Sequence, residues 1–511
     1  MSIDWLESYG DGQAPPVFVL ATGQELGGKL VRRLVDEVAR QFTHPDKSLV
    51  LCLGDRDLGT VVAYLAALRE GHAVAFLTGR RGLAAPDLDL VRRYQPEYVV
   101  PSSSRETLTP WMAAHADELR SLGYAPVTLG RPEMTIFRRT AAPTGAIADE
   151  VAVLLGTSGT TGSPQAVMLS QAGLTANVDA VVTALKQTSA ERAITSLPIR
   201  HSYGLSVLNT HLRVGATTVL TEHRPSSMRF WDEVVKSGAT SFAAVPTTYQ
   251  FLTARHRELI DGSRVRTMTQ AGGRLSDDLV RTYWSLMDRH GGRFFVMYGQ
   301  TEATARMAVL DAADLPARIG SAGRALPGGR FSIDESVTAS LTTRTERRSG
   351  EVCYEGPGVM IGYTTGRGEL APGAVSPTVP PAVLRTGDLG YLDDGYLYIT
   401  GRTKRIAKLF GQRVSLDEIE RLLPADSAAV TDDRTLYLAL TRPADAGRDY
   451  PREIAALLDV PDRMVVVRGV AALPRTGSGK TDYPAVLELI LAGPDPSATH
   501  PGSPPPSPRT T

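Results

Sequence analysis

A loop rich in glycine and hydroxyl side chains follows the apolar run 151–155 and offers a site for an anion. Glycine permits backbone conformations that other residues avoid, so successive N–H groups can converge on one oxyanion while neighbouring hydroxyls add donors. A flexible linker is the alternative, but linkers rarely begin at the end of a buried strand. We therefore predict a phosphate-binding loop, with these members: Thr157, Ser158, Gly159, Thr160, Thr161 and Gly162.

Three further motifs place charged or aromatic side chains beside glycine. A carboxylate in such a turn is an oxygen donor of the kind that Mg²⁺ prefers. Each motif alone could be an ordinary turn, since an Asp after Gly commonly bonds its own backbone. The motifs are Tyr298-Gly299-Gln300-Thr301-Glu302, the segment 384–389 with Asp388, and the segment 401–404 with Arg402 and Lys404.

A lysine near the C-terminal end, Lys480, stands in the sequence Gly479-Lys480-Thr481. These three residues resemble the end of a Walker A loop, but that loop requires glycine six residues before the lysine. Pro474 occupies that position here. The segment is therefore not a Walker A loop, and Lys480 is either an exposed turn lysine or a cation delivered to a site elsewhere.

The segments that must position these residues alternate between short apolar runs and amphipathic stretches. Residues 48–53, 59–70 and 72–77 predict strand, helix and strand, and similar units recur to residue 297. This pattern predicts an α/β fold with largely parallel sheets, whose strand ends carry the chemistry. After residue 340 the sequence favours strands and Gly-rich turns.

Three regions follow from this pattern. We predict a large N-terminal domain over 1–400, built of layered α/β sheets plus a β-rich subdomain, and a small mobile α+β domain over 401–490. The tail 491–511 is dominated by Pro, Ser and Thr, which bury too little apolar surface to fold, so we expect it to be disordered.

The composition limits the kinds of molecule that this protein is expected to bind. Lys plus Arg and Asp plus Glu both number 55 in 511 residues, so no net charge favours nucleic acid or an anionic membrane. No run approaches the ~20 apolar residues of a membrane span, and the first residues do not read as a signal peptide. The two cysteines, Cys52 and Cys353, lack zinc-ligand spacing. We expect a cytoplasmic protein that binds small molecules.

The phosphate loop and the motifs at 298–302, 384–389 and 401–420 occur together in an order and spacing that resemble the AMP-forming adenylating enzymes. That superfamily includes acyl- and aryl-CoA synthetases, adenylation domains of nonribosomal peptide synthetases, and beetle luciferases. The resemblance covers residues 15–490. It implies ATP and Mg²⁺ as cofactors, with CoA or a phosphopantetheine carrier as co-substrate.

The resemblance also implies roles for individual residues. Loop hydroxyls would hold the β- and γ-phosphates, Thr301 would contact the α-phosphate, and Glu302 would bind magnesium. Asp388 would accept hydrogen bonds from the ribose hydroxyls, and Arg402 would approach the ribose or a phosphate. The adenine would stack on Tyr298. The remaining nucleotide-binding positions are Gly272 and Gly273, which would form the opposite wall, with Gly299 and Gln300.

Two residues carry the mobile domain's implied roles. Lys480 would neutralise charge between the carboxylate and the α-phosphate, as the lysine of the family's mobile domain does. Lys404 occupies the family's hinge position, where a large rotation separates the two half-reactions. Gly411 would line the acceptor channel, or it is a simple turn residue.

Gln165 departs from the family, which usually has lysine there. Without that charge we expect weaker pyrophosphate binding, by about 1 kcal/mol. The implied acid pocket includes His201, as a catalytic gate or a structural histidine. Arg200 and Arg306 could recognise a second substrate charge or form surface ion pairs.

The sequence thus predicts an ATP-dependent AMP-forming acid ligase that transfers its acyl group to CoA or a carrier-protein thiol. One alternative uses an amine acceptor or activates an oxyanion such as nitrite for N–N bond formation. Another is a non-catalytic nucleotide-binding scaffold, favoured by Gln165 and opposed by Glu302, Asp388 and Lys480.

Overall fold

A computed structural model describes most of the chain. The described residues are 3–9, 15–77, 88–131, 133–141, 145–156, 165–337, 349–374, 383–409, 412–424, 426–432, 434–441, 448–458, 460–476 and 479–492. The chain divides into two compact units. The large unit comprises Met1–Ser332, Val352–Thr386 and Leu392–Tyr398, and the small unit comprises Ile333–Glu351, Gly387–Tyr391 and Ile399–Thr511.

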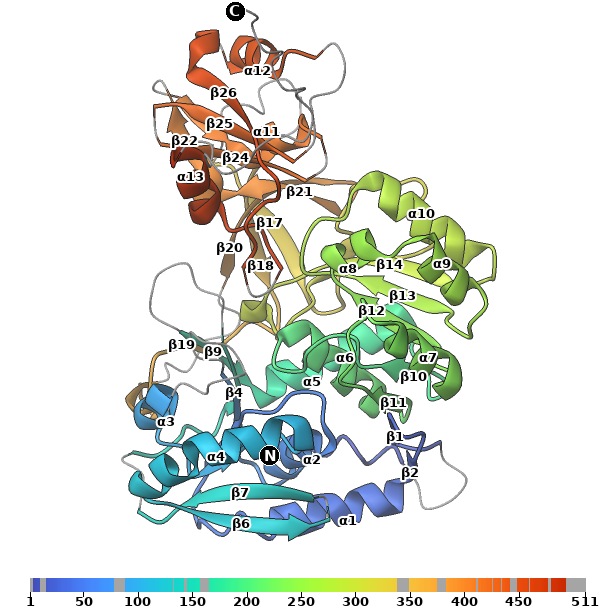
Figure 1. Ribbon diagram of the computed structural model, residues 1–511, viewed down its shortest axis with the longest axis vertical. Coiled ribbons are helices and arrows are strands. Elements are labelled where there is room, and N and C mark those ends of the chain that lie inside the picture. Colours follow the sequence, from blue (N-terminus) through green and yellow to red (C-terminus); the bar gives the residue numbers. More distant parts are fainter. Residues whose placement is uncertain are drawn as a thin grey trace, which may run out of the picture. The chain divides into compact units, whose positions relative to one another are not determined.

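A nine-stranded sheet forms one part of the large unit (Figure 1). Its interior strands are parallel and nearly all buried, as expected for apolar runs covered on both faces by helices. Antiparallel strands close both edges. The spatial order is β16 (Arg324–Ala325), β15 (Ala308–Leu310), β14 (Arg293–Tyr298), β13 (Thr267–Gln270), β12 (Ser241–Ala244), β10 (Arg192–Ile194), β11 (Thr217–Leu220), β1 (Phe18–Leu20) and β2 (Glu25–Leu26).

An eight-stranded mixed sheet forms the other part. Strands β8 and β9 are antiparallel neighbours, and Gly156 at the end of β8 pairs with Ala166 at the start of β9. The predicted phosphate loop therefore joins two adjacent strand ends. The spatial order is β19 (Gly362–Thr364), β9 (Ala166–Ser170), β8 (Val151–Gly156), β4 (Ala73–Phe76), β3 (Leu49–Cys52), β5 (Tyr98–Val100), β7 (Glu133–Arg139) and β6 (Tyr124–Gly130).

One continuous apolar core contains side chains from both of these sheets and from the helices beside them. Helix α2 has ten of its twelve residues buried, because its sequence is apolar on every side. Its Tyr64 hydroxyl donates to Asn209 Oδ1 of α6 at 3.0 Å. The helices of the large unit are α1 (Gly28–Ala39), α2 (Leu58–Arg69), α3 (Leu88–Tyr94), α4 (Arg105–Ser121), α5 (Gln171–Leu185), α6 (Ser202–Arg213), α7 (Met228–Ser237), α8 (Pro246–Phe251), α9 (Ala254–Asp261) and α10 (Asp277–Asp288).

A four-stranded sheet contains the β-rich sequence that follows residue 329. Its last two strands form a hairpin whose loop residues, Asp394 and Gly395, both have positive φ, at 52° and 77°. Two successive positive φ angles are typical of a type I′ turn, which matches the twist of the flanking strands. The order is β17 (Arg330–Asp334), β18 (Gly350–Glu355), β20 (Leu384–Asp393) and β21 (Tyr396–Arg402).

The C-terminal part of the small unit is an α+β arrangement (Figure 1). On β24, Ala429 packs with helices α11 and α12, whereas Ala428 and Val430 pack with α13. This alternation follows from the two-residue period of a strand and buries both faces of the sheet. The elements are β22 (Ile406–Leu409), β23 (Gln412–Ser415), α11 (Leu416–Arg421), β24 (Ser427–Thr431), β25 (Leu436–Leu440), α12 (Tyr450–Leu458), β26 (Val465–Gly469) and α13 (Tyr483–Leu491).

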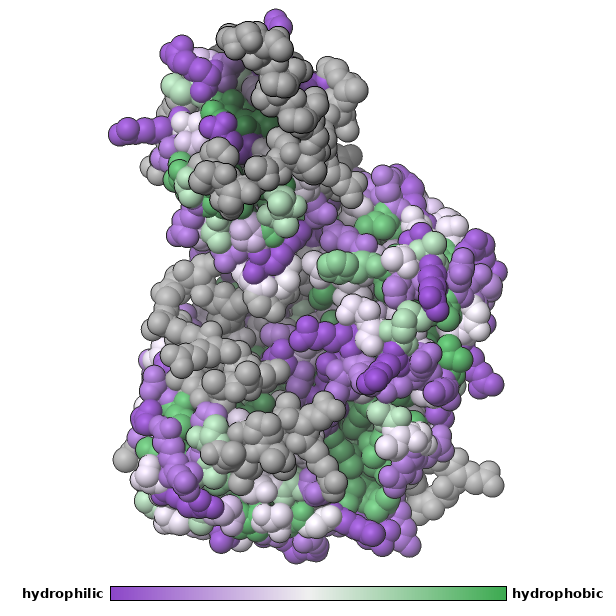
Figure 2. Space-filling model, viewed as in Figure 1, coloured by the Kyte–Doolittle hydropathy of each residue, from purple (hydrophilic) through white to green (hydrophobic). Residues whose placement is uncertain are grey.

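Hydrophilic side chains dominate the face shown in Figure 2, with smaller apolar areas between them. Among the described residues, no helix has both the length and the apolar character that crossing a bilayer demands. The predicted strand, helix and strand near residues 48–77 are present as β3, α2 and β4, shifted by one residue at some ends.

Candidate functional site

The carboxyl ends of β13 and β14 lie side by side, because Gln270 and Val296 are paired in register. Two residues beyond this pair stand Gly272, which follows the end of β13, and Tyr298, the last residue of β14. Gly272 has a φ of +84°, which favours glycine, and the amide of Gln270 donates to the Gly273 carbonyl at 2.6 Å. The two glycines and the tyrosine predicted to enclose a flat base are therefore neighbours.

A tight turn follows Tyr298. A Cβ atom at Gly299 would lie 1.6 Å from the carbonyl oxygen of Ala305, so no other residue fits. Ala305 and Thr304 have φ angles of 95° and 57°, which are strained for residues with a side chain. Gln300 fixes the turn by donating from Nε2 to the carbonyl of Thr386 at 2.8 Å. This turn places Thr301 and Glu302, the two residues after Gln300, beyond the carboxyl end of β14.

Thr301, the first of those two residues, contacts α6. Its hydroxyl lies 3.2 Å from the hydroxyl of Ser202, the first residue of that helix. His201 is the residue before the helix, and its side chain is exposed. Ser202 therefore links two predicted roles. It contacts Thr301, predicted to bind the α-phosphate, and it directly follows His201, predicted to gate the acid pocket.

Glu302, the second residue, is held by a tyrosine from another strand. Tyr363 on β19 donates its hydroxyl to Glu302 Oε1 at 2.9 Å, and burial together with this carboxylate raises the pKa of Tyr363. Tyr363 pairs with Val167, next to the Gly156–Ala166 pair from which the predicted phosphate loop departs. The Glu302 carboxylate is thus tied to β19, the neighbour of the strand that follows the loop.

This carboxylate fits the requirements of magnesium. Glu302 is half-buried and supplies a hard oxygen donor. No group of three or more His, Cys, Asp or Glu side chains in the described part of the chain could hold a metal ion alone. A magnesium ion at Glu302 would therefore need additional oxygen ligands from phosphates and water, which is how this ion is usually bound beside nucleotides.

In the small unit, Asp388 and Arg402 form an ion pair. Arg402 Nε lies 3.1 Å from Asp388 Oδ1, with the Asp388 side chain only 5% exposed and the Arg402 side chain 58% exposed. Gly387, with a φ of +70°, donates its N–H to Glu351 Oε1, and its carbonyl accepts from the Thr403 hydroxyl. These bonds fix the buried carboxylate next to an arginine that reaches the surface.

Lys404, the predicted hinge, is exposed and is followed by a firmly anchored residue. Arg405 is buried, forms ion pairs with Asp417 at 2.8 Å and with Glu420, and lies 3.5 Å from the Tyr483 ring centroid. The first anchored side chain of the C-terminal part therefore comes directly after the predicted hinge.

Lys480 lies in a short hairpin of the same unit. Arg475 and Thr481 form an isolated antiparallel bridge, and Thr476 donates its N–H to the Lys480 carbonyl at 2.8 Å. Arg475 is paired in turn with Asp426 at 3.0 Å. This hairpin presents an exposed lysine at its surface.

Several predicted residues lie outside the described part of the chain. They include the acceptor-channel residue Gly411 and the core of the phosphate loop. Gln165, where the description resumes after that loop, is exposed. The loop positions concerned are Thr157, Ser158, Gly159, Thr160, Thr161 and Gly162.

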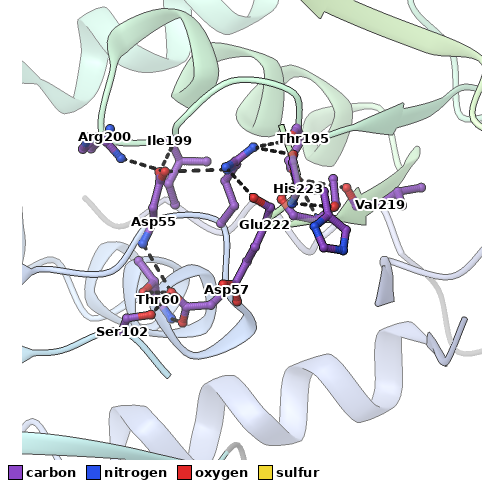
Figure 3. A network of polar contacts seen from close by, with 12 residues as sticks. Asp55, Asp57, Thr60, Ser102, Thr195, Ile199, Arg200, Val219, Glu222 and His223 are labelled. Carbon is purple, nitrogen blue, oxygen red and sulfur yellow. Dashed lines mark hydrogen bonds and ion pairs between the residues drawn. The ribbon is translucent and has the colours of Figure 1, made fainter. Parts of the chain in front are cut away.

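A polar network holds the segment that leads into α6 (Figure 3). Asp55, in the turn between β3 and α2, accepts from the backbone N–H of Ile199 and from Arg200 Nη1, both at 2.7 Å. Arg56 beside it donates to the Thr195 carbonyl at 3.1 Å. Arg200 is therefore already paired with a carboxylate, which favours the ion-pair interpretation of that arginine.

A small cavity lies between α5, α6 and the strained turn. Its lining includes the hydroxyl residues Ser202, Ser206 and Thr304, with Asn177. The Ser206 hydroxyl and Asn177 Oδ1 are buried without a hydrogen-bond partner among the described residues. The other lining residues are Leu155, Leu169, Leu174, Val178 and Leu205, so the cavity is mostly apolar with a few polar groups.

Tyr363 is the residue at this site to which the sequence assigned no role. Nothing in its local sequence links it to Glu302, which is 61 positions away. The link depends on the antiparallel pairing of β19 with β9, a long-range contact. The sequence shows only a tyrosine in a short strand between β18 and β20, which by itself does not indicate a contact with Glu302.

Known proteins share this sequence pattern and this fold. Residues 16–364 match the family described as AMP-binding enzyme. A feruloyl-CoA synthase from an Amycolatopsis species is 32% identical over 353 residues, covering 65% of this chain and 68% of that protein. A sulfoacetate–CoA ligase from Cupriavidus necator is 30% identical over 380 residues, covering 71% and 72%.

Solved structures show the same fold over almost the whole chain. ATP-bound MatB from Rhodopseudomonas palustris has a TM-score of 0.70 at 21% identity, covering 96% of this chain and 99% of that one. The amide bond synthetase McbA from Marinactinospora thermotolerans has a TM-score of 0.71 at 22% identity, covering 95% and 99%. The predicted α/β fold with a large N-terminal and a small C-terminal domain is confirmed. The chain belongs to the AMP-binding enzyme family, the superfamily of acyl-CoA ligases and other adenylate-forming enzymes.

Proposed function

We propose that this protein is an ATP-dependent, AMP-forming acid ligase that adenylates a carboxylic acid and transfers the acyl group to the thiol of CoA or of a carrier protein. The observation that carries the proposal is the cluster at the carboxyl ends of β13 and β14. There Gly272 and Tyr298 stand side by side, and the next turn presents Thr301 and Glu302. This cluster supports the proposal because Tyr298 and Gly272 would enclose the base, Thr301 would contact a phosphate and Glu302 would bind magnesium, all at the carboxyl ends of the same two strands.

In the first half-reaction, a carboxylate oxygen of the acid attacks the α-phosphorus of ATP. The new bond is O–P, the bond between the α-phosphorus and the bridging oxygen breaks, and pyrophosphate leaves with the electron pair. Thr301 would donate to the α-phosphate, and the loop hydroxyls would hold the leaving group. Magnesium held by Glu302 would offset phosphate charge. Lys480 would supply a cation between the two anions as they approach.

In the second half-reaction, the sulfur of a thiol attacks the acyl carbonyl and forms a C–S bond, the acyl–oxygen bond breaks, AMP leaves with the electron pair, and the thiol proton passes to solvent. As the family resemblance implies, a rotation of the small unit would separate the two steps and withdraw Lys480 before the acceptor enters. Lys404 is exposed and directly precedes the anchored Arg405, which suits it to be the pivot. Asp388 would bind the ribose hydroxyls, and its ion-pair partner Arg402 would approach the ribose or a phosphate.

Several acids and several acceptors are compatible with this proposal. Ferulate and sulfoacetate, which the names of two relatives give, differ in size and charge. An amine acceptor is the second candidate, because the amide bond synthetase shares this fold. Activation of nitrite and a non-catalytic scaffold are the remaining alternatives.

The test is acid-dependent exchange of labelled pyrophosphate into ATP across a panel of carboxylic acids and nitrite. Acids that support exchange are then incubated with CoA, a carrier protein or an amine, and the products are identified together with AMP. We expect exchange with at least one carboxylic acid and AMP, not ADP, as the nucleotide product. Exchange with nitrite alone, ADP formation, or silence with every acid would refute the proposal.

Lys480→Ala gives the sharper form of this test. We expect the variant to lose exchange while its thermal unfolding stays unchanged, because the side chain is exposed. Lys236→Ala is the matched control, since that lysine is exposed near the end of α7, away from the proposed site. Retained exchange in Lys480→Ala would contradict the role of Lys480.

A further inference from the structure

Arg306 is a buried cation without a counter-charge among the described residues. It is 2% exposed and ranks among the largest fully buried side chains. Its Nε and Nη1 atoms are buried and have no hydrogen-bond partner among the described residues. An unpaired buried charge is among the most unfavourable arrangements in a folded protein.

Other buried arginines of this chain have carboxylate partners. Arg367 donates from Nη2 to Glu97 Oε1 at 2.8 Å and from Nη1 to Glu97 Oε2 at 3.0 Å. Arg405 is paired with Asp417 and Glu420. Arg306 differs from both, so its burial is explained by something other than a pairing within the described part of the fold.

Arg306 nevertheless keeps its positive charge at neutral pH. Burial lowers the pKa of its guanidinium to about 10, and the neighbouring Tyr203 opposes part of that shift. Because this value lies well above 7, the folded protein holds a proton there under working conditions. The fold therefore holds a charged, desolvated guanidinium at this position.

The position of this charge relates it to the predicted reaction centre. The guanidinium carbon lies 5.2 Å from the centroid of the Tyr203 ring, and the Tyr203 hydroxyl is 2.7 Å from that of Thr269 on β13. Ser202, the residue before Tyr203, contacts Thr301. Consecutive Cα atoms are about 3.8 Å apart. The first turn of α6 therefore carries both Ser202, which contacts the predicted α-phosphate residue Thr301, and Tyr203, whose ring lies against Arg306.

Two features hold Arg306 in this place. Its carbonyl accepts from Asn177 Nδ2 of α5 at 2.7 Å, and the next residue, Met307, donates its N–H to the Tyr298 carbonyl. The strained φ angle of Ala305 directly precedes it. Strained backbone of this kind persists where the surrounding structure fixes it and is frequent at functional sites.

We infer that the acid activated by this enzyme carries a second anionic group, a carboxylate or a sulfonate, which pairs with Arg306 while the first carboxylate is adenylated. The inference rests on the proposed function and names its substrate class. A guanidinium presents a planar fork of donors that matches a carboxylate or sulfonate, and pairing removes the cost of the buried charge. An acid with an apolar tail would leave that charge unpaired and cover it.

The first test compares acids of equal carbon number that differ only in the second charge. The pairs are propionate with malonate, butyrate with succinate, and valerate with glutarate, and 3-sulfopropionate represents the sulfonates. We expect kcat/KM for pyrophosphate exchange to favour the dianion by about 100-fold or more in at least one pair, because sites built around a polar partner reject analogues that lack it. Equal use of both members of every pair would overturn the inference and leave adenylation established.

The second test removes the charge. Arg306→Met should lose the preference for the dianion and should unfold at a higher temperature than the wild type without ligand. Arg367→Met is the matched control and should unfold at a lower temperature, because it leaves Glu97 buried without its partner. Arg306→Lys keeps the charge without the fork and should retain only part of the preference.

A binding measurement keeps the inference testable without turnover or a stable variant. With the wild-type protein and ATP, we expect the preferred dianion to raise the unfolding temperature and its monoanionic counterpart to do so much less. If no acid supports exchange but this selective stabilisation is seen, the proposed function fails and the anion site stands. If neither exchange nor stabilisation distinguishes the two charge types, the anion site is refuted.

Discussion

The hydroxyl of Tyr363 donates a 2.9 Å hydrogen bond to Oε1 of Glu302. This bond joins β19, at the edge of the eight-stranded sheet, to the turn that follows β14 of the nine-stranded sheet. A carboxylate that binds a metal ion benefits from such a partner, because the hydrogen bond restricts the rotamers of the carboxylate before the ion binds. We therefore predict that Tyr363 positions Glu302.

Replacing Tyr363 with phenylalanine should weaken the use of magnesium. A hydrogen bond to a carboxylate contributes about 1–1.5 kcal/mol, so we expect the apparent KM for Mg²⁺ to rise about 5- to 10-fold in Tyr363→Phe. The readout is pyrophosphate exchange titrated with Mg²⁺ at fixed ATP. At saturating Mg²⁺ the rate should recover most of its wild-type value.

The matched control is Tyr437→Phe, which removes a 3.2 Å hydrogen bond from a tyrosine to the exposed carboxylate of Asp432 in the small unit. That variant should leave the Mg²⁺ dependence unchanged. An unaltered Mg²⁺ titration in Tyr363→Phe would refute the positioning role.

Local sequence was sufficient to predict several strands and the turns that follow them. The apolar run 293–297 is present as β14, and Gly299 and Glu302 lie in the turn after it, because strands of this type are bounded by glycine. The strand before Gly272 was not among the predicted runs, and the role of that glycine is implied by the family resemblance alone. The sequence also indicated a small α+β region from residue 401. These features depend on contacts that are close along the chain.

Long-range pairing could not be predicted in the same way. Tyr363 reaches Glu302 only through the register of β19 on β9, and Arg200 reaches Asp55 across 145 positions. The sequence therefore left Arg200 and Arg306 equivalent. The structure separates them, because one arginine has a carboxylate partner and the other has none among the described residues.

Gln165 offers a gain-of-function prediction. It is exposed and follows the predicted phosphate loop, at a position where the resembled family usually has lysine. Restoring the charge in Gln165→Lys should lower the apparent KM for ATP about 5-fold, equivalent to ~1 kcal/mol for a partly solvated contact. Because such a contact is screened by ions, the gain should shrink at high salt.

The measurement is the KM for ATP at low and high ionic strength. Gln165→Met, which has similar length without charge, is the control and should not lower KM. A KM that Gln165→Lys leaves unchanged at both salt concentrations would show that the position makes no phosphate contact.

The hinge prediction concerns Lys404. Proline fixes φ and removes the N–H group, so Lys404→Pro should restrict rotation at this residue. We expect transfer to the acceptor to slow at least 10-fold more than adenylation, which single-turnover measurements of the two half-reactions can separate. Lys404→Ala keeps the backbone freedom and is the matched control. Equal slowing of both steps in Lys404→Pro would place the pivot elsewhere.

The buried pair of Glu97 and Arg367 makes a stability prediction that is independent of function. Both side chains are at most 4% exposed, Glu97 also accepts the N–H of Leu49 at 2.7 Å, and Arg367 donates to the Gly145 carbonyl. Arg367→Met leaves a buried carboxylate without its cation, which should lower the free energy of unfolding by about 3–5 kcal/mol. Urea denaturation measures this change if the transition of the large unit is reversible.

An exposed pair provides the comparison. Arg40, directly after the end of α1, pairs with Glu37 in the last turn of that helix, with side chains 65% and 40% exposed, so Arg40→Met should cost less than about 1 kcal/mol. Replacing both members of the buried pair, in Glu97→Gln with Arg367→Met, should recover part of the loss, because the uncompensated carboxylate is gone. A double variant no more stable than Arg367→Met would mean that lost packing, and not the stranded charge, sets the cost.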